Sequence, residues 1–186
     1  VVEPATVWTD RLPRKFLDTG PRIVRAPVAE LSFVGGKFDA RMGTPGDSGQ
    51  QADWWIYEDL VRPLIRLDAA VGYPREEVTL SAVTYDQMRP GAWQAKARLE
   101  DMDANWVEAS LCFPSFPRFC GQTFTEANDR ELGLLCVKAY NDWMVDVWCG
   151  GSGGRLIPLC IVPLWDAELA AAETKWGQPS GLALLL

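Results

Sequence analysis

The second half of the chain begins with a helical pattern and then a strand-like one. Ala95–Ala104 is typical of a short helix with Leu99 and Met102 turned inward. Val107–Phe113 is a nearly continuous apolar run that ends at Pro114. Runs of this kind are typical of strands that are buried on both faces, as in a parallel sheet.

A longer helix is predicted after this strand. Asn128 and Glu131 have the spacing of a capping box, and Gly150 ends the helical pattern. The glycine-rich segment 150–154 closes a helix and leads into a strand, so it indicates a helix C-cap and connecting loop rather than a phosphate-binding loop. The inward stripe is predicted to contain Leu132, Leu135, Cys136, Ala139, Trp143 and Val147.

A second apolar run and a further helix complete the alternation. Leu156–Leu164 predicts another buried strand, and Asp166 is placed to cap a helix that contains Leu169, Ala172 and Glu173. From residue 95 onward the order is therefore helix, strand, helix, strand, helix. This alternation favours a parallel α/β architecture in which the two strands are neighbours.

The first half has weaker patterns. Apolar residues recur through Trp54–Val71 at spacings of three and four, which predicts a helix that Pro63 interrupts or kinks and that Gly72 ends. The remaining segments predict an irregular start with a helical turn at Pro13–Leu17, a short hairpin arm at Val28–Phe38 and a surface loop at Arg41–Asp53.

Length and composition favour one domain. The chain has 186 residues, of which 48% are hydrophobic and 23% are charged, as in ordinary globular proteins. We expect a single incomplete barrel domain over residues 1–186, with an irregular and helical insertion at 1–94 and βα units at 95–186. The chain is short for a complete (β/α)₈ barrel, which usually needs about 250 residues.

Charge and residue usage exclude several classes of function. The net charge is −7 and Lys and Arg are scattered, so nucleic acid and anionic membrane surfaces are poor partners. No apolar run approaches the roughly 20 residues of a membrane span. The five cysteines form no close pair, which predicts reduced thiols in a cytoplasmic protein. The absence of histidine excludes Ser-His-Asp and Cys-His catalysis within this chain.

Two loops that follow predicted strands carry the candidate substrate-binding residues. In βα barrels the chemistry lies on loops after the C-terminal ends of strands. The first loop contains Ser115, Phe116 and Arg118, and the second contains Trp165 and Asp166. Arg118 has the geometry to hold a substrate carboxylate, against the alternative of a surface ion pair with a nearby acid. For Asp166, the role of helix cap is favoured over that of a catalytic acid.

Five stretches in order resemble the amidohydrolase-related proteins of the aminocarboxymuconate-semialdehyde decarboxylase type. They are Glu3–Pro13, Thr84–Pro90, Arg98–Arg118, Ala139–Trp143 and Arg155–Asp166. The resemblance implies the first half of an α/β (β/α)₈ barrel of the TIM type with a long N-terminal insertion. It also implies a small-molecule substrate, either a carboxylate or a cyclic compound, and a homo-oligomer. The unpaired strand edges and uncovered apolar faces of a truncated barrel predict self-association of the chain.

In that family a divalent metal, expected to be Zn²⁺, is held by His and Asp residues, and the metal activates water and polarises the substrate. No position of this chain matches a ligand, and Val1 falls where the chain would leave the family's first Asp-x-His pair. We therefore expect no metal site and no activity in this chain, which would be a fragment. Hydrolysis and decarboxylation both stay open, and a non-catalytic binding or scaffold module derived from the same fold is the alternative.

Overall fold

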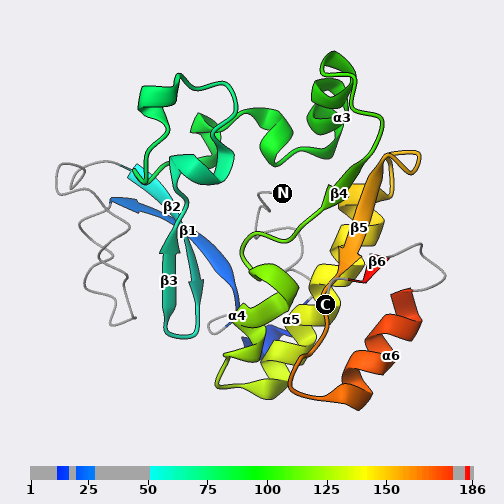
Figure 1. Ribbon diagram of the computed structural model, residues 1–186. Helices are drawn as coiled ribbons and strands as arrows, with labels where there is room; N and C mark the ends of the chain where they lie inside the picture. Colours follow the sequence, from blue (N-terminus) through cyan, green and yellow to red (C-terminus); the bar gives the residue numbers. More distant parts are fainter. Residues whose placement is uncertain (1–11, 17–19, 28–50, 178–182, 185–186) are drawn as a thin grey trace.

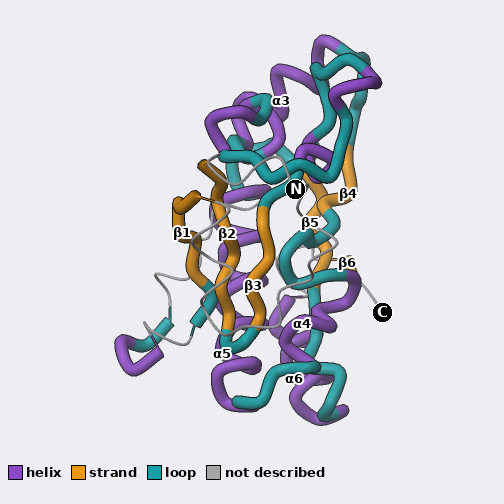
Figure 2. Tube along the Cα trace, turned by 90° about the vertical axis from the view of Figure 1, so that its left-hand side faces the viewer, coloured by secondary structure: helices purple, strands orange, loops and turns teal. Residues whose placement is uncertain are grey.

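Two small sheets organise the molecule in the computed structural model, which describes residues 12–16, 20–27, 51–177 and 183–184. One sheet is antiparallel, in the order β1-β2-β3, and the other is parallel, in the order β4-β5-β6. Figures 1 and 2 show the two sheets side by side, with α3 at one end of the molecule and α4 and α6 at the other. The strands are β1 (Arg22–Pro27), β2 (Gln51–Tyr57), β3 (Leu60–Pro63), β4 (Ser110–Cys112), β5 (Leu156–Cys160) and β6 (Ala183–Leu184).

The helix predicted at Trp54–Val71 is wrong, because this segment forms the hairpin β2–β3. Two runs rich in Trp, Ile, Tyr and Val flank a turn at Glu58 and Asp59, and such residues favour strands. Residues 51–53, predicted as the end of a loop, belong to β2. The antiparallel sheet therefore lies within the region predicted as irregular and helical, residues 1–94, while the proposed division at 94/95 stays a prediction.

Burial on both faces hides the strand period of β2. Trp55 and Tyr57 pack into the main core, whereas Trp54 and Ile56 belong to a second apolar cluster with Ala52, Val61 and Ala82. Every residue from Ala52 to Tyr57 is buried. Without a polar face there is no alternation to detect, and the helical spacing in this segment is coincidental.

The prediction of adjacent parallel strands is confirmed. Ser110 pairs with Leu156 and Cys112 with Pro158 in a parallel register. The expected burial on both faces fails for β4, where Leu111 is 51% exposed. The face of the sheet that carries Leu111 is therefore open to solvent at this strand, and in the described part of the chain β4 is also an edge strand.

The predicted helices at 95–104 and after residue 128 are present. The first is α3 (Ala95–Ala104), with Met102 buried and Leu99 partly buried against the core. The second is α5 (Arg130–Trp143), which continues as a π-helical turn over Met144–Cys149. The cap is Asp129 rather than Asn128, because the Asp129 carboxylate accepts a hydrogen bond from the amide of Leu132 at 3.0 Å.

The predicted inward stripe of α5 holds up to Trp143 and then fails. Leu132, Cys136, Ala139 and Trp143 are buried and Leu135 packs partly against the core, but Val147 is 47% exposed. A π-helical turn takes more residues than an α-helical one. The next inward position therefore moves from Val147 to Trp148, which is 2% exposed.

Asp166 is a helix cap, as predicted. Its carboxylate accepts hydrogen bonds from the amides of Glu168 and Leu169 at the start of α6 (Ala167–Gly177). Behind this helix, the buried amide of Asn141 donates to the carbonyl of Ile161 at 2.9 Å and to the carboxylate of Glu173 at 3.0 Å. The Asn141 Oδ1 atom accepts from the amide of Ile161 at 3.1 Å, so one side chain joins α5, the end of β5 and α6.

Short helical turns connect the longer elements. The predicted turn near Pro13–Leu17 appears as a 3₁₀ helix at Arg14–Phe16, whereas the predicted hairpin arm at Val28–Phe38 lies outside the described residues. Within the described ranges, no helix is long and apolar enough to cross a membrane. The other short helices are Arg66–Ala69, Arg75–Glu77, Tyr85–Gln87, Pro90–Ala92, Phe119–Gly121 and the four-residue α4 (Gln122–Thr125).

Candidate functional site

A hollow of about 270 Å³ opens between the β2–β3 turn and the loop that follows β4. The turn contributes Tyr57, the two acids Glu58 and Asp59, and Arg62 from β3. The loop after β4, the short helix α4 and the segment between α4 and α5 contribute the other wall, which is lined by Phe116, Arg118, Thr123, Glu126, Ala127 and Asn128. The hollow thus lies beyond the C-terminal end of β4, where βα-barrel enzymes carry their chemistry.

Aromatic stacking fixes the loop after β4 against β2. Phe116 is buried and stacks on Trp55, with ring centroids 4.2 Å apart and planes at 11°. Tyr57 meets Phe116 and Phe124 edge-on at 6.3 and 5.6 Å. Aromatic pairs at such distances stabilise beyond the area they bury. The Thr123 hydroxyl also donates to the carbonyl of Phe116 at 2.8 Å, so the base of the hollow is rigidly built.

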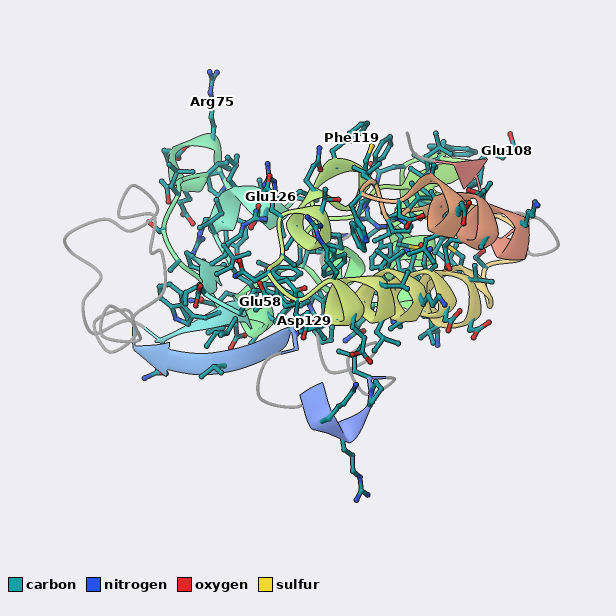
Figure 3. All side chains as sticks on the ribbon, turned by 90° about the horizontal axis from the view of Figure 1, so that it is seen from below. Glu58, Arg75, Glu108, Phe119, Glu126 and Asp129 are labelled. Carbon is teal, nitrogen blue, oxygen red and sulfur yellow. The ribbon has the colours of Figure 1, made fainter. Side chains whose placement is uncertain are left out.

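Glu58 joins the hairpin turn to the start of α5. Its carboxylate accepts hydrogen bonds from the amides of Asn128 and Asp129 at 2.8 and 2.9 Å, and a further one from the Asn128 side chain. Figure 3 shows Glu58 next to Asp129. A carboxylate that accepts backbone amides near a helix N-terminus is stabilised by the helix dipole. Glu58 adopts a φ of 47°, an unusual conformation for a residue with a side chain.

Arg118 is held in a strained backbone at the rim of the hollow. Its φ and ψ are 60° and 178°, a region that essentially only glycine populates. Cys120 and Gly121 also have positive φ values, of 59° and 80°. The Arg118 guanidinium donates to Glu126 at 2.8 Å, and both side chains are more than half exposed. Of the two roles considered for Arg118, the structure therefore contains the surface ion pair.

The ionisable groups below the rim stay neutral near pH 7. Burial, reinforced by nearby Cys136 and Glu58, raises the pKa of Tyr57 well above its usual value of 10. Burial likewise raises the pKa of the Cys136 thiol. Because both groups keep their protons, the charge of the hollow comes from its three acids, Glu58, Asp59 and Glu126, and from its two arginines, Arg62 and Arg118.

A family model described as amidohydrolase matches residues 53–183 of the chain. The chain belongs to the amidohydrolase family. No curated protein matches it. The match begins in β2 and includes the hairpin, the loop after β4 and all of α5, so every wall of the hollow lies within the part of this amidohydrolase that its family defines.

Amidohydrolases generally use divalent metals, and the residues described in this chain do not fit such a group. The sequence has no histidine, and over the described ranges no three Cys, Asp or Glu side chains come together as ligands. All five cysteines are buried free thiols. The Cys112 sulfur accepts a hydrogen bond from the Trp148 indole at 3.3 Å, and hydrogen bonds from Cys149 and then Trp148 lower the pKa of Cys112 below its usual value.

The five predicted site residues are only partly brought together in this amidohydrolase. Phe116 and Arg118 line the hollow, and Ser115 lines a narrow recess beside it together with Phe116. Trp165 and Asp166 line neither space. The Arg130 guanidinium lies 5.0 Å from the Trp165 ring centre, and Asp166 caps α6.

Sequence reasoning missed the wall that the hairpin supplies, from Tyr57 to Arg62. The available signal was the two-residue polar break at 58 and 59 between two runs of strand-forming residues, because that spacing is typical of a hairpin.

Proposed function

We propose that this chain supplies the substrate-binding wall of a metal-dependent amidohydrolase of the aminocarboxymuconate-semialdehyde decarboxylase type, built as part of a (β/α)₈ barrel. Family membership supports the enzyme class, and the parallel pair β4–β5 with α5 between its strands in sequence is compatible with such a barrel. The substrate class we propose is a small cyclic carboxylate. Hydrolysis and decarboxylation are both chemistries of the proposed type.

The observation that supports this substrate class is the strained backbone of Arg118 at the rim of the hollow. Strained residues persist where the surrounding structure over-determines them, and they cluster at functional sites. Arg118 is such a residue, and its guanidinium lies at the rim of a hollow with an aromatic base. A planar carboxylate can take both donors of a guanidinium fork. A substrate carboxylate would displace Glu126, whose exposed ion pair with Arg118 stabilises by only about 0–1 kcal/mol.

The residues of this chain would then bind and orient rather than react. Arg118 would hold the carboxylate, and the aromatic base made by Tyr57 and Phe116 would lie under the ring of the substrate. The raised pKa of Tyr57 keeps its hydroxyl neutral, so no second negative charge forms there to repel the substrate. No step is assigned to a metal, because the described residues do not fit one.

Titration of the isotope-labelled chain with benzoate, followed by amide chemical shifts, tests this proposal. We expect shifts at residues 57–62 and 115–128 that are lost in Arg118→Gln and weakened in Arg118→Lys, which keeps the charge but not the fork. Arg75→Gln is the matched control, since Arg75 projects away from the body of the molecule (Figure 3). Benzoate shifts that persist unchanged in Arg118→Gln would refute the role of Arg118.

A specific observation favours one alternative, a binding or scaffold module without chemistry of its own. Leu111, Phe113 and Phe119 expose about half of their surface around β4, and the rings of Phe113 and Phe119 are stacked at 6.2 Å. Exposed apolar residues beside an open strand edge recruit other chains. Under this alternative the chain alone self-associates and has no catalytic activity, as the absence of histidine also leads us to expect.

A further inference from the structure

A second hollow, of about 310 Å³, lies between the 3₁₀ helix Arg66–Ala69 and α3, and it shares no lining residue with the first. Its apolar wall is entirely aliphatic and consists of Leu67, Ala69, Ala70, Val71 and Ala92. Leu67 is 55% and Val71 68% exposed, so both large side chains can be covered by a bound molecule. The first hollow, in contrast, has an aromatic base.

Two of the four charged residues that line this hollow neutralise each other. Arg89 donates from Nε to one oxygen of Asp101 at 2.8 Å and from Nη2 to the other at 2.5 Å. Gly91 permits this arrangement, because a Cβ there would lie 2.0 Å from an oxygen of Asp101. Both carboxylate oxygens of Asp101 are therefore already occupied by the bidentate pair.

The third charged residue, Asp68, also has hydrogen-bond partners. Its carboxylate accepts from the Arg62 guanidinium at 3.3 Å and from the amide of Ile65 at 3.4 Å. Burial raises the pKa of Asp68, so this acid opposes a neighbouring anion less than an exposed one would.

Arg98 is the cation that remains. It lies on α3 one turn before Asp101 and is partly buried. In the part of the chain that the structure describes, its guanidinium makes no side-chain hydrogen bond or ion pair, although its charge adds to the hydrogen bond from Arg89 in lowering the pKa of Asp101. The hollow thus combines an aliphatic wall with one guanidinium whose donors are unused, which is the pairing that a fatty-acid-like anion requires.

We propose that this hollow is a second ligand site, which takes a short aliphatic carboxylate with its acid group on Arg98 and its chain against Leu67 and Val71. This second site uses no residue of the first hollow. The two sites differ in the ligand they favour, since one offers aromatic rings and the other only aliphatic side chains.

Calorimetric titration of the chain with hexanoate, hexylamine and hexan-1-ol tests the charge requirement. We expect hexanoate to bind, and the uncharged alcohol and the cationic amine to bind at least about tenfold more weakly, as the loss of one charge-assisted contact predicts. Amide shifts on hexanoate binding should map to residues 67–71 and 89–101. Equal binding of the alcohol, or shifts confined to residues 57–62, would overturn the proposal.

Two variants locate the site without threatening the fold. Arg98→Gln should weaken hexanoate binding about tenfold or more, and Val71→Asp should do the same by placing a carboxylate in the exposed wall. Arg75→Gln and Arg118→Gln should bind hexanoate like the wild type. Unchanged binding in both Arg98→Gln and Val71→Asp would refute the site, whereas a loss in Arg118→Gln would move it to the first hollow. The benzoate titration tests only the first hollow and the hexanoate titration only the second, so either proposal can fail while the other holds.

Discussion

The strained backbone of Arg118 predicts an inverted ranking of glycine and alanine. At φ 60° and ψ 178° a residue with a Cβ costs about 1–3 kcal/mol relative to glycine. Glycine in turn loses about 0.5–1 kcal/mol through the greater entropy of its unfolded chain. Both Arg118→Gly and Arg118→Ala lose the ion pair with Glu126, so that contribution cancels. Arg118→Gly should therefore be more stable than Arg118→Ala by about 1 kcal/mol, and by at most about 2.5 kcal/mol.

Urea unfolding of the two variants, compared through midpoints at equal slope, measures this difference. Lys138 is the matched control, because it is exposed in the middle of α5 and has ordinary helical geometry. There the order should reverse, with Lys138→Ala more stable than Lys138→Gly by about 1 kcal/mol. If Arg118→Ala is as stable as Arg118→Gly, the backbone is not strained at this position, and backbone strain no longer supports a substrate role of Arg118.

Further outcomes are expected in other parts of the molecule. Asn141→Leu should lower the free energy of unfolding by at least about 3 kcal/mol, because it leaves the Ile161 amide and carbonyl and the Glu173 carboxylate unpaired. A loss of less than about 1 kcal/mol, measured by urea unfolding, would contradict this. Burial and then Glu173 raise the pKa of Cys160 to about 12, so the folded state keeps a proton that the unfolded state releases above pH 9. Between those values the wild type should lose about 1.4 kcal/mol per pH unit relative to Cys160→Ala, and parallel pH profiles would rule this out. Sedimentation should show self-association of the wild type that Leu111→Lys reduces, and a compact monomeric wild type would exclude it. Elemental analysis after dialysis should find no stoichiometric zinc, and one zinc per chain would refute that expectation.

The sequence was informative where elements have one polar face. The helix at 95–104, the start of α5 and the cap at Asp166 were predicted because a solvent-facing side leaves a visible period or a recognisable capping residue. The parallel pair was predicted from two apolar runs separated by a helix. β2 was missed because both of its faces are buried, and a strand without a solvent-facing side shows no alternation of polar and apolar residues.

The candidate site was half predictable for a related reason. Phe116 and Arg118 come after a strand that could be recognised, so their loop could be placed. The opposite wall, with Glu58 and Arg62, depends on how a distant hairpin packs against that loop. The bonds from Asn128 and Asp129 to Glu58 join residues 70 and 71 positions apart, a separation about which local patterns carry no information.

The π-helical turn at Met144–Cys149 makes the end of α5 tolerant of a change in chain length. Its wider turn brings Trp148 inward, where its indole donates to the sulfur of Cys112 at the end of β4. Removing one residue between Trp143 and Val147 would restore α-helical winding, and Trp148 would then follow Trp143 at the ordinary inward spacing of about four residues. The indole would stay on the side of Cys112, and the elements after the turn would keep their register. The same deletion within the α-helical part of α5 would instead rotate every later residue by about 100° and turn Trp148 away from β4.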